Sequence, residues 1–94
     1  MPAYWIGRAN IVNQEKAKAY MPLTAATVKK FGGKYLARGG NHISKEGEDY
    51  KRNVIIEFPS MELAEAAYES EDYRQARKIL DGGMDRLFVI VEGV

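Results

Sequence analysis

Apolar and polar positions follow one another along the chain in a pattern that predicts four strands and three helices. Segments rich in aromatic and β-branched residues indicate strands over 3–9, 34–38, 53–58 and 86–92. The second strand is expected to resume at 42–44, and the polar segment 45–49 to turn the chain into a hairpin. Helix-forming residues occupy 14–31, 61–69 and 71–80.

Each predicted helix is preceded by a residue whose side chain can cap it. Asn13, Ser60 and Ser70 carry an oxygen that can accept from a free backbone N–H in the first turn. Pro22 interrupts the first helical segment, because proline lacks a donor and clashes with the carbonyl four residues earlier. We therefore expect a kink or a restart of the helix there.

The order strand, helix, strand, strand, helix, strand matches the ferredoxin-like βαββαβ plan of the α+β class. Right-handed crossovers then place the helices on one face of a four-stranded antiparallel sheet with the spatial order 4-1-3-2. The length of 94 residues fits one domain over 1–94.

The last strand predicts a partner. Its centre, Leu87 to Val91, is apolar at every position, although a half-exposed edge strand normally alternates. The helices can cover only one face, and a second copy of the sheet is the simplest cover for the other. We therefore expect a homodimer, with Phe88 or Ile90 facing the partner sheet.

The charge balance and the lack of cysteine narrow the function classes. Fourteen basic and thirteen acidic residues give a net charge of +1, which provides no strong field for nucleic acid or an anionic membrane. No apolar segment approaches membrane-spanning length, and the N-terminus lacks the apolar core of a signal peptide. The absence of cysteine fits a reducing compartment, so we expect a cytoplasmic protein.

Several segments, in the right order, carry a resemblance to a known family. They are Tyr4-Trp5-Ile6, Gly-Gly-Lys-Tyr-Leu-Ala-Arg-Gly-Gly at 32–40, Asn-Val-Ile-Ile-Glu-Phe-Pro-Ser at 53–60, Tyr-Glu-Ser-Glu-Asp-Tyr at 68–73 and Val-Glu-Gly at 91–93. Over the whole chain the sequence resembles the family called domain of unknown function 1330. The resemblance implies a dimeric α/β barrel formed by two packed sheets. It implies no reaction, because this superfold hosts oxygenases, haem-handling enzymes, isomerases and ligand-binding dimers.

Charged residues within apolar strands are the first candidates for a site. If the hairpin turns near Gly47, Arg38 lies opposite Glu57, and Tyr4 and Glu92 continue this row across the sheet. Arg38 could then hold a substrate carboxylate while Glu57 acts as a base. The alternative, which we favour, is a structural Arg38–Glu57 ion pair, because buried charges are normally paired. Arg8 is a further candidate ligand-binding residue from the first strand.

His42 and Tyr68 complete the candidate set. His42 is the only histidine and the only side chain whose ordinary pKa lies near neutrality, although a surface imidazole after a glycine pair is the more common situation. Tyr68, like Tyr20 and Tyr73, is a helical aromatic residue that either lines a pocket or packs in the core. One imidazole without thiols gives no zinc-type set, and the glycine pairs do not match a phosphate-binding loop. We therefore expect no metal, haem, flavin or nucleotide cofactor.

Two functions of different classes remain open. The first is a dimer that binds a small organic ligand without turnover. The second is a cofactor-independent enzyme, oxygenase- or isomerase-like, that acts on a small organic acid or aromatic substrate. The lack of any set of nucleophile, base and orienting group favours the first function. A cavity lined by Arg38, His42 and tyrosines would favour the second.

Overall fold

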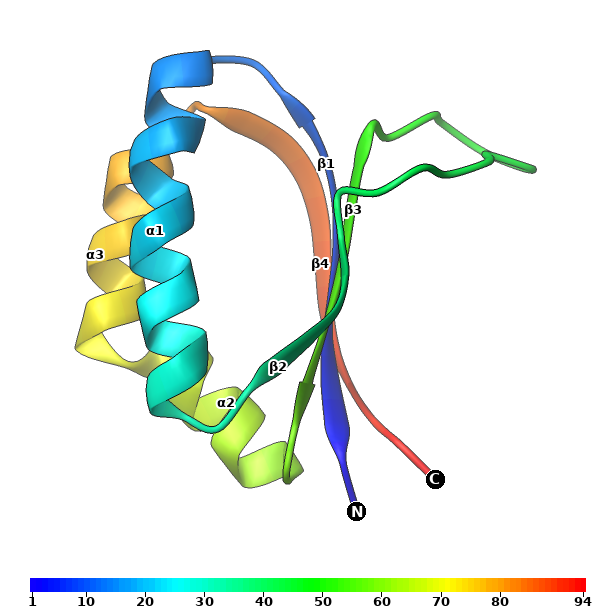
Figure 1. Cartoon of the computed structure of the whole chain (residues 1–94). Coiled ribbons are helices and arrows are strands. Elements are labelled where there is room, and N and C mark those ends of the chain that lie inside the picture. The colour runs from blue at the N-terminus through cyan, green and yellow to red at the C-terminus, as the bar shows by residue number, and fades with distance from the viewer.

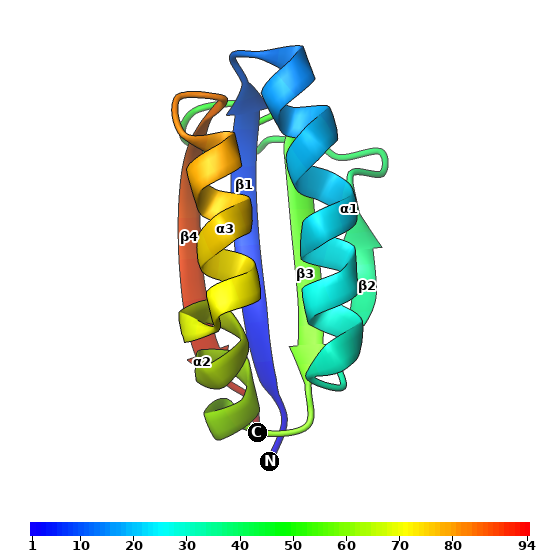
Figure 2. The same ribbon diagram turned by 90° about the vertical axis from the view of Figure 1, so that its left-hand side faces the viewer.

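The computed structural model describes residues 1–94, and the chain forms two layers, a sheet and a set of helices that covers one of its faces (Figures 1 and 2). The strands are β1 (Ala3–Ile11), β2 (Lys34–Arg38), β3 (Arg52–Phe58) and β4 (Met84–Glu92). The helices are α1 (Gln14–Lys30), α2 (Met61–Glu69) and α3 (Glu71–Leu80). No helix is both long and apolar enough to cross a lipid bilayer.

The sheet confirms the predicted ferredoxin-like topology. Its strands lie in the order β2-β3-β1-β4, with β1 antiparallel to both β3 and β4 and β2 antiparallel to β3. Read from the other edge, this is the expected order 4-1-3-2. Figure 2 shows α1 and α3 side by side in front of the sheet. The α+β class and the placement of all helices on one face are therefore confirmed.

The core lies between the sheet and the helices and is rich in aromatic rings. Trp5, Phe58 and Tyr73 are at most 1 % exposed, and the Trp5 indole lies 4.9 Å from each of the other two rings, centroid to centroid. The indole N–H donates to the carbonyl of Ala64 at 2.9 Å, so its polar atom is satisfied inside the core. Tyr68 and Phe88 extend this cluster.

The three predicted caps are confirmed, but the helix does not restart at Pro22. The side chains of Asn13, Ser60 and Ser70 accept from backbone N–H groups three residues later. The first helix runs through Pro22 as one element. Pro22 lies on the exposed side of α1, as does Lys18, whose carbonyl loses its helical donor. Water can satisfy that carbonyl, so the helix need not break.

The hairpin between β2 and β3 differs from the prediction. No strand forms at 42–44, and residues 39–51 make a long loop that projects beyond the sheet in Figure 1. Within β2 the register shifts between Tyr35 and Ala37, which makes Leu36 the extra residue of a bulge. The shift and the longer loop place Arg38 opposite Val54 rather than opposite Glu57.

The face of the sheet away from the helices is apolar and uncovered. Leu87, Val89 and Val91 of β4 lie on it and are 54 %, 53 % and 43 % exposed. Phe88 and Ile90 point to the other side and pack against the core. The expectation that Phe88 or Ile90 faces a partner is therefore wrong, because strand alternation places the odd-numbered residues on the open face.

Candidate functional site

A pocket lies between the sheet and α1. The empty space within its outline is about 560 Å³, and this volume includes open solvent at the mouth. Its floor is formed by the helix-facing positions of all four strands, and its wall by residues of α1. Nine of its fifteen lining residues are hydrophobic; the full lining is Trp5, Gly7, Arg8, Ala9, Tyr20, Met21, Thr24, Tyr35, Arg38, Arg52, Val54, Ile56, Met84, Arg86 and Phe88.

The charges in this lining are all of one sign. Arg38, Arg52 and Arg86 contribute their side chains from helix-facing strand positions, and no aspartate or glutamate lines the pocket. None of these three arginines takes part in an ion pair anywhere in the chain. The net charge of the whole chain is only +1, so the concentration of positive charge is local to this pocket.

Arg38 and Arg52 lie at the mouth of the pocket. The Arg38 guanidinium stacks on the Tyr35 ring at 4.1 Å from its centroid, and the residue is exposed. The Arg52 guanidinium lies beside Gly39, the residue after Arg38. A Cβ added to Gly39 would be only 2.7 Å from Arg52 Nη1. Burial raises the pKa of Tyr35 despite the nearby Arg38 and Arg52, so its phenol is neutral.

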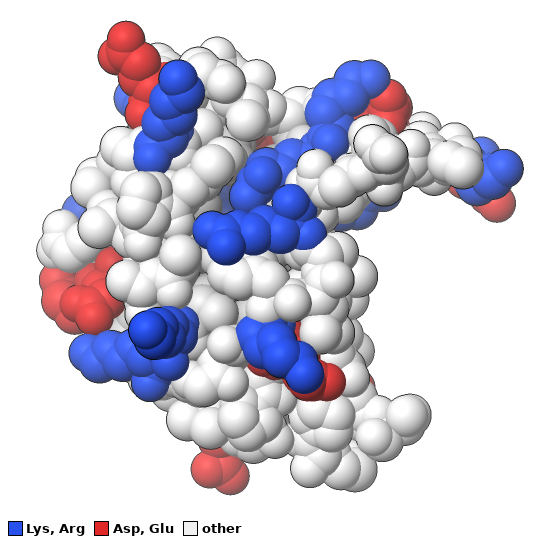
Figure 3. Space-filling view, in the orientation of Figure 1, with Lys and Arg blue, Asp and Glu red and all other residues white.

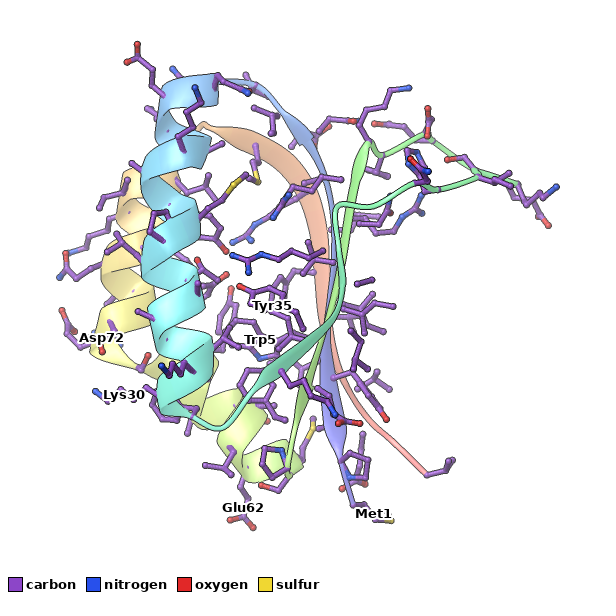
Figure 4. The ribbon with its side chains drawn as sticks, in the orientation of Figure 1. Met1, Trp5, Lys30, Tyr35, Glu62 and Asp72 are labelled. Carbon is purple, nitrogen blue, oxygen red and sulfur yellow. The ribbon has the colours of Figure 1, made fainter.

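The figures show the same arrangement. Figure 4 shows the labelled Trp5 and Tyr35 side chains pointing from the sheet into the space next to the helices. Figure 3 shows Lys and Arg atoms gathered on this side, between the helical layer and the sheet. Guanidinium donors of this kind are the groups that bind carboxylate and phosphate ligands in proteins.

Arg86 marks the interior of the pocket. Its Nη1 donates to the Tyr20 hydroxyl at 2.9 Å and its Nη2 to the Tyr73 hydroxyl at 3.3 Å, and the two hydroxyl oxygens are 2.5 Å apart. Burial raises the pKa of Tyr73 far above its ordinary value, so Tyr73 stays protonated. Burial alone would lower the pKa of Arg86, but the adjacent Tyr20 and Tyr73 outweigh it and raise that pKa.

Thr24 adds an unsatisfied polar group on the helix side. It is 7 % exposed, it lines the pocket, and its Oγ1 makes no hydrogen bond. It lies one helical turn after Tyr20, so both residues face the sheet. A buried hydroxyl without a partner costs free energy, and a polar ligand atom in the pocket could satisfy it.

Only two of the six residues chosen from the sequence, Arg38 and Arg8, line this pocket. The predicted contact between Arg38 and Glu57 is wrong, because Glu57 lies opposite Lys34 on the other face of the sheet. Lys34 Nζ lies 3.7 Å from Glu57 Oε1, and the Tyr4 hydroxyl donates to Glu57 Oε2 at 3.4 Å. The row observed across the sheet is therefore Lys34, Glu57, Tyr4 and Val91, with neither Arg38 nor Glu92 of the predicted row in it.

The Arg8 side chain lies on the other face of the sheet, because Arg8 is opposite the open-face residue Leu87. Its side chain donates through Nε to Asn53 Oδ1 at 2.9 Å, and its guanidinium lies 5.1 Å from the centroid of the Tyr50 ring. It is therefore held in place and is less free than Arg38 to bind a ligand. Tyr68 packs in the aromatic core beside Trp5 and Phe88, with Arg77 stacked 4.6 Å from its ring centroid.

His42 lies in the projecting loop, away from the pocket. Its Nε2 is 2.9 Å from Asp49 Oδ1, which also accepts from Ser44, while the other carboxylate oxygen of Asp49 contacts Lys51. Hydrogen bonds from Lys51, Ser44 and His42 hold the pKa of Asp49 well below its usual range. This cluster is exposed and serves to order the loop. No three His, Cys, Asp or Glu side chains of the chain are arranged to hold a metal ion.

Sequence reasoning missed Arg52, Arg86 and Thr24 as site residues. Arg52 and Arg86 lie opposite the same residue, Ala9, on the two strands that flank β1. One feature of the sequence could have identified Arg86. It lies two residues before Phe88 in the last strand, so both side chains face the same side of the sheet. The sequence distinguishes Tyr20 only as one of several aromatic residues in the predicted helices.

Solved structures with the same fold include proteins of unknown function and a cofactor-independent oxygenase. A protein of unknown function from Rhodopseudomonas palustris is 18% identical, with 99% of this chain and 82% of that chain covered and a TM-score of 0.82. SnoaB, a cofactor-independent oxygenase from Streptomyces nogalater, is 10% identical, with 99% and 93% covered and a TM-score of 0.67. A dimeric ferredoxin-like protein of unknown function from Jannaschia sp. CCS1 is 11% identical, with 99% and 100% covered and a TM-score of 0.68.

At these identities the likeness shows the fold alone. No curated protein matches the chain. A family model, described as Domain of unknown function (DUF1330), matches residues 2–94, which is nearly the whole length. The resemblance carried by the segments from Tyr4 to Gly93 is thereby confirmed, and the chain belongs to the DUF1330 family.

Proposed function

We propose that the pocket between the sheet and α1 binds a small organic acid, and that the protein does so as a homodimer without a cofactor. The observation that carries the proposal is the composition of the lining, in which three arginines, Arg38, Arg52 and Arg86, occur at helix-facing strand positions without any acidic residue. A carboxylate is the ligand group that guanidinium donors bind best, often through two parallel hydrogen bonds.

Arg38 and Arg52 are the residues that would hold the carboxylate. Arg8 and Arg86 already use their side chains in hydrogen bonds, to Asn53 and to two tyrosines. Arg38 and Arg52 have no such partner; both line the pocket, and the Arg52 guanidinium lies beside Gly39, the residue that follows Arg38. An anion between them would relieve the repulsion of two like charges.

The remainder of the ligand would be apolar or aromatic. Trp5, Tyr35 and Phe88 supply rings to the lining, and Met21 and Met84 supply side chains that adapt to an irregular outline. Small-molecule sites commonly combine an apolar lining with a few polar groups. The lining of this pocket has that composition.

The homodimer is proposed from the open face of the sheet. Leu36, Leu87, Val89 and Val91 leave a broad apolar area exposed there. Figure 3 shows this side of the molecule as a hollow surface with few charges, below the projecting loop. Exposed apolar areas of this kind mark association sites, and a small domain gains stability from such burial. Three similar structures are described as dimeric, which supports the proposal.

A second candidate function is catalysis on such an acid without a cofactor. The observation that favours it is the contact of a pocket tyrosine, Tyr20, with the Arg86 guanidinium and with a second phenol. A hydroxyl polarised in this way can stabilise negative charge on a substrate oxygen. SnoaB, which shares the fold, is a cofactor-independent oxygenase.

The proposal is tested by titration of benzoate, followed by the fluorescence of Trp5. Trp5 is the only tryptophan of the chain and lines the pocket, so a bound ligand should change its emission. Arg38→Gln and Arg52→Gln should each weaken binding by about tenfold or more, the loss expected for a charge-assisted hydrogen bond.

The matched control is Arg74→Gln. Arg74 is an exposed arginine of α3 that pairs with Glu71 and lies outside this pocket. Its replacement should leave benzoate affinity unchanged. Equal losses in all three variants, or no fluorescence change in the unmodified protein, would contradict the proposed site.

A further inference from the structure

The hydrogen bonds around Tyr73 fix the direction in which its proton is donated. Tyr73 is 0% exposed, and its hydroxyl contacts only the Tyr20 hydroxyl and Arg86 Nη2. A guanidinium group can donate but cannot accept. The Tyr20 oxygen is therefore the only acceptor for the Tyr73 proton, and a buried hydroxyl proton without an acceptor would cost free energy.

It follows that Tyr20 has its own proton free. The Tyr20 oxygen accepts from Tyr73 and from Arg86 Nη1 at 2.9 Å, which uses both acceptor positions of a phenolic oxygen. Neither neighbour can accept in return. Tyr20 lines the pocket, whereas Tyr73 does not, so the free proton is available to the interior of the pocket. The two incoming hydrogen bonds also polarise the Tyr20 O–H and make it a stronger donor.

Thr24 provides an independent observation at the same place. Its buried Oγ1 lacks a partner, and it lines the pocket one turn along α1 from Tyr20. The interior end of the pocket thus has two hydroxyl groups whose hydrogen bonding the chain itself does not complete. A ligand atom that accepts from Tyr20 could also bond to Thr24.

The strands that carry Arg52 and Arg86 lie on the two sides of β1. Arg52 and Arg86 are opposite the same residue of β1, so their strands are two spacings, roughly 10 Å, apart. Arg86 donates to Tyr20, and Arg52 lies beside Gly39, the residue that follows Arg38. A ligand whose carboxylate is bound by Arg38 and Arg52 would present a different atom to Tyr20.

We propose that Tyr20 donates a hydrogen bond to a second oxygen of the ligand, and that the ligands are aromatic acids with an oxygen acceptor remote from the carboxylate. This inference rests on the proposed acid-binding function and specifies its ligand class. A carbonyl oxygen meets the requirement, because it accepts a hydrogen bond without bringing a second charge into the interior.

Two acids of the same outline test the inference, 4-acetylbenzoate and 4-isopropylbenzoate. Only the first has an acceptor opposite the carboxylate. Trp5 fluorescence should show 4-acetylbenzoate binding about tenfold more tightly to the unmodified protein, as expected for one well-placed hydrogen bond in a buried site. Tyr20→Phe should abolish this preference, so that the two acids bind with equal affinity.

The matched control is Tyr35→Phe, which removes another hydroxyl from the pocket lining but should keep the preference. Tyr73→Phe retains the Tyr20 hydroxyl, removes the donor that orients it, and should reduce the preference. If Tyr20→Phe does not fold, Tyr73→Phe tests the role of Tyr20 instead, and an undiminished preference for 4-acetylbenzoate in that variant overturns it.

The outcomes separate the two proposals. Equal affinity of the unmodified protein for both acids, with a loss in Arg38→Gln, overturns the role of Tyr20 and leaves the acid site intact. No binding of either acid overturns the acid site, and this inference with it. A preference that survives in Tyr20→Phe also overturns the role of Tyr20.

Discussion

The hydroxyl oxygens of Tyr20 on α1 and Tyr73 on α3 lie 2.5 Å apart, and Arg86 on β4 donates to both. This contact joins two helices to the edge of the sheet at the interior end of the pocket. It consists of three side chains from distant parts of the sequence, and it contains no carboxylate. The Arg86 guanidinium is thus hydrogen-bonded to two phenol oxygens, and it also lies 5.3 Å from the centroid of the Phe88 ring.

The first prediction concerns the stability of this contact. Tyr73→Phe should lower the free energy of unfolding by about 1 to 2 kcal/mol, because it removes one partner from Arg86 and one from Tyr20. Urea denaturation measures the change. Tyr50→Phe is the control, because the Tyr50 ring is buried elsewhere, against Arg8. Equal effects of the two substitutions would contradict the structural role of the network.

A second prediction uses Gly7, which leaves space in the pocket floor. A Cβ built on Gly7 would meet Phe88 Cδ2 at 3.6 Å, an ordinary contact, so Gly7→Ala should fold and bind benzoate. Gly7→Leu should fill part of the pocket and weaken benzoate binding by about tenfold or more, because ligand and side chain would compete for the same volume. Trp5 fluorescence measures binding and circular dichroism the fold. Unchanged affinity in folded Gly7→Leu would place the ligand elsewhere.

The third prediction concerns association through the open face of the sheet. The unmodified protein should sediment at about twice 10.6 kDa. Val89→Asp should sediment as a monomer, because it brings an unpaired charge into an apolar interface. Ile79→Asp changes a similarly exposed residue on α3 and should leave the dimer intact. A monomeric unmodified protein, or a dimeric Val89→Asp variant, would contradict this interface.

The topology could be predicted from the sequence because its signals are local. The Asn13, Ser60 and Ser70 caps and the apolar strand at 86–92 each depend on a few neighbouring residues. The order of elements then leaves few possible arrangements. The continuous helix through Pro22 was not predicted. Whether a helix can accommodate an internal proline depends on which of its sides faces the solvent.

The site could be predicted only in part, because it depends on register. A bulge at Leu36 and a loop over 39–51 decide that Arg38 faces the helices, and neither has a local signal strong enough to fix the register. The approach of Tyr20, Tyr73 and Arg86 requires the packing of α1 and α3 on β4. Residues so far apart in the chain show no mutual spacing in the sequence.

A fourth prediction tests the observed register. Double-mutant cycles in urea denaturation should give a coupling energy near zero for Arg38 and Glu57, because their side chains lie on opposite faces of the sheet. Lys34 and Glu57 should couple by about 0.2 to 1 kcal/mol, the range of exposed ion pairs, since the Lys34 side chain is 69% exposed. A larger coupling for the first pair than for the second would contradict the register of β2 on β3.

The most direct test of the acid site is a crystal structure of the protein with 4-bromobenzoate, because anomalous scattering locates the bromine independently of the protein density. We expect the carboxylate between Arg38 and Arg52 and the bromine inside the pocket, toward Tyr20 and Thr24. The site should remain empty in an Arg38→Gln, Arg52→Gln double variant under the same conditions. A bromine peak outside this pocket, or an empty pocket in the unmodified protein at saturating ligand, would contradict the proposed function.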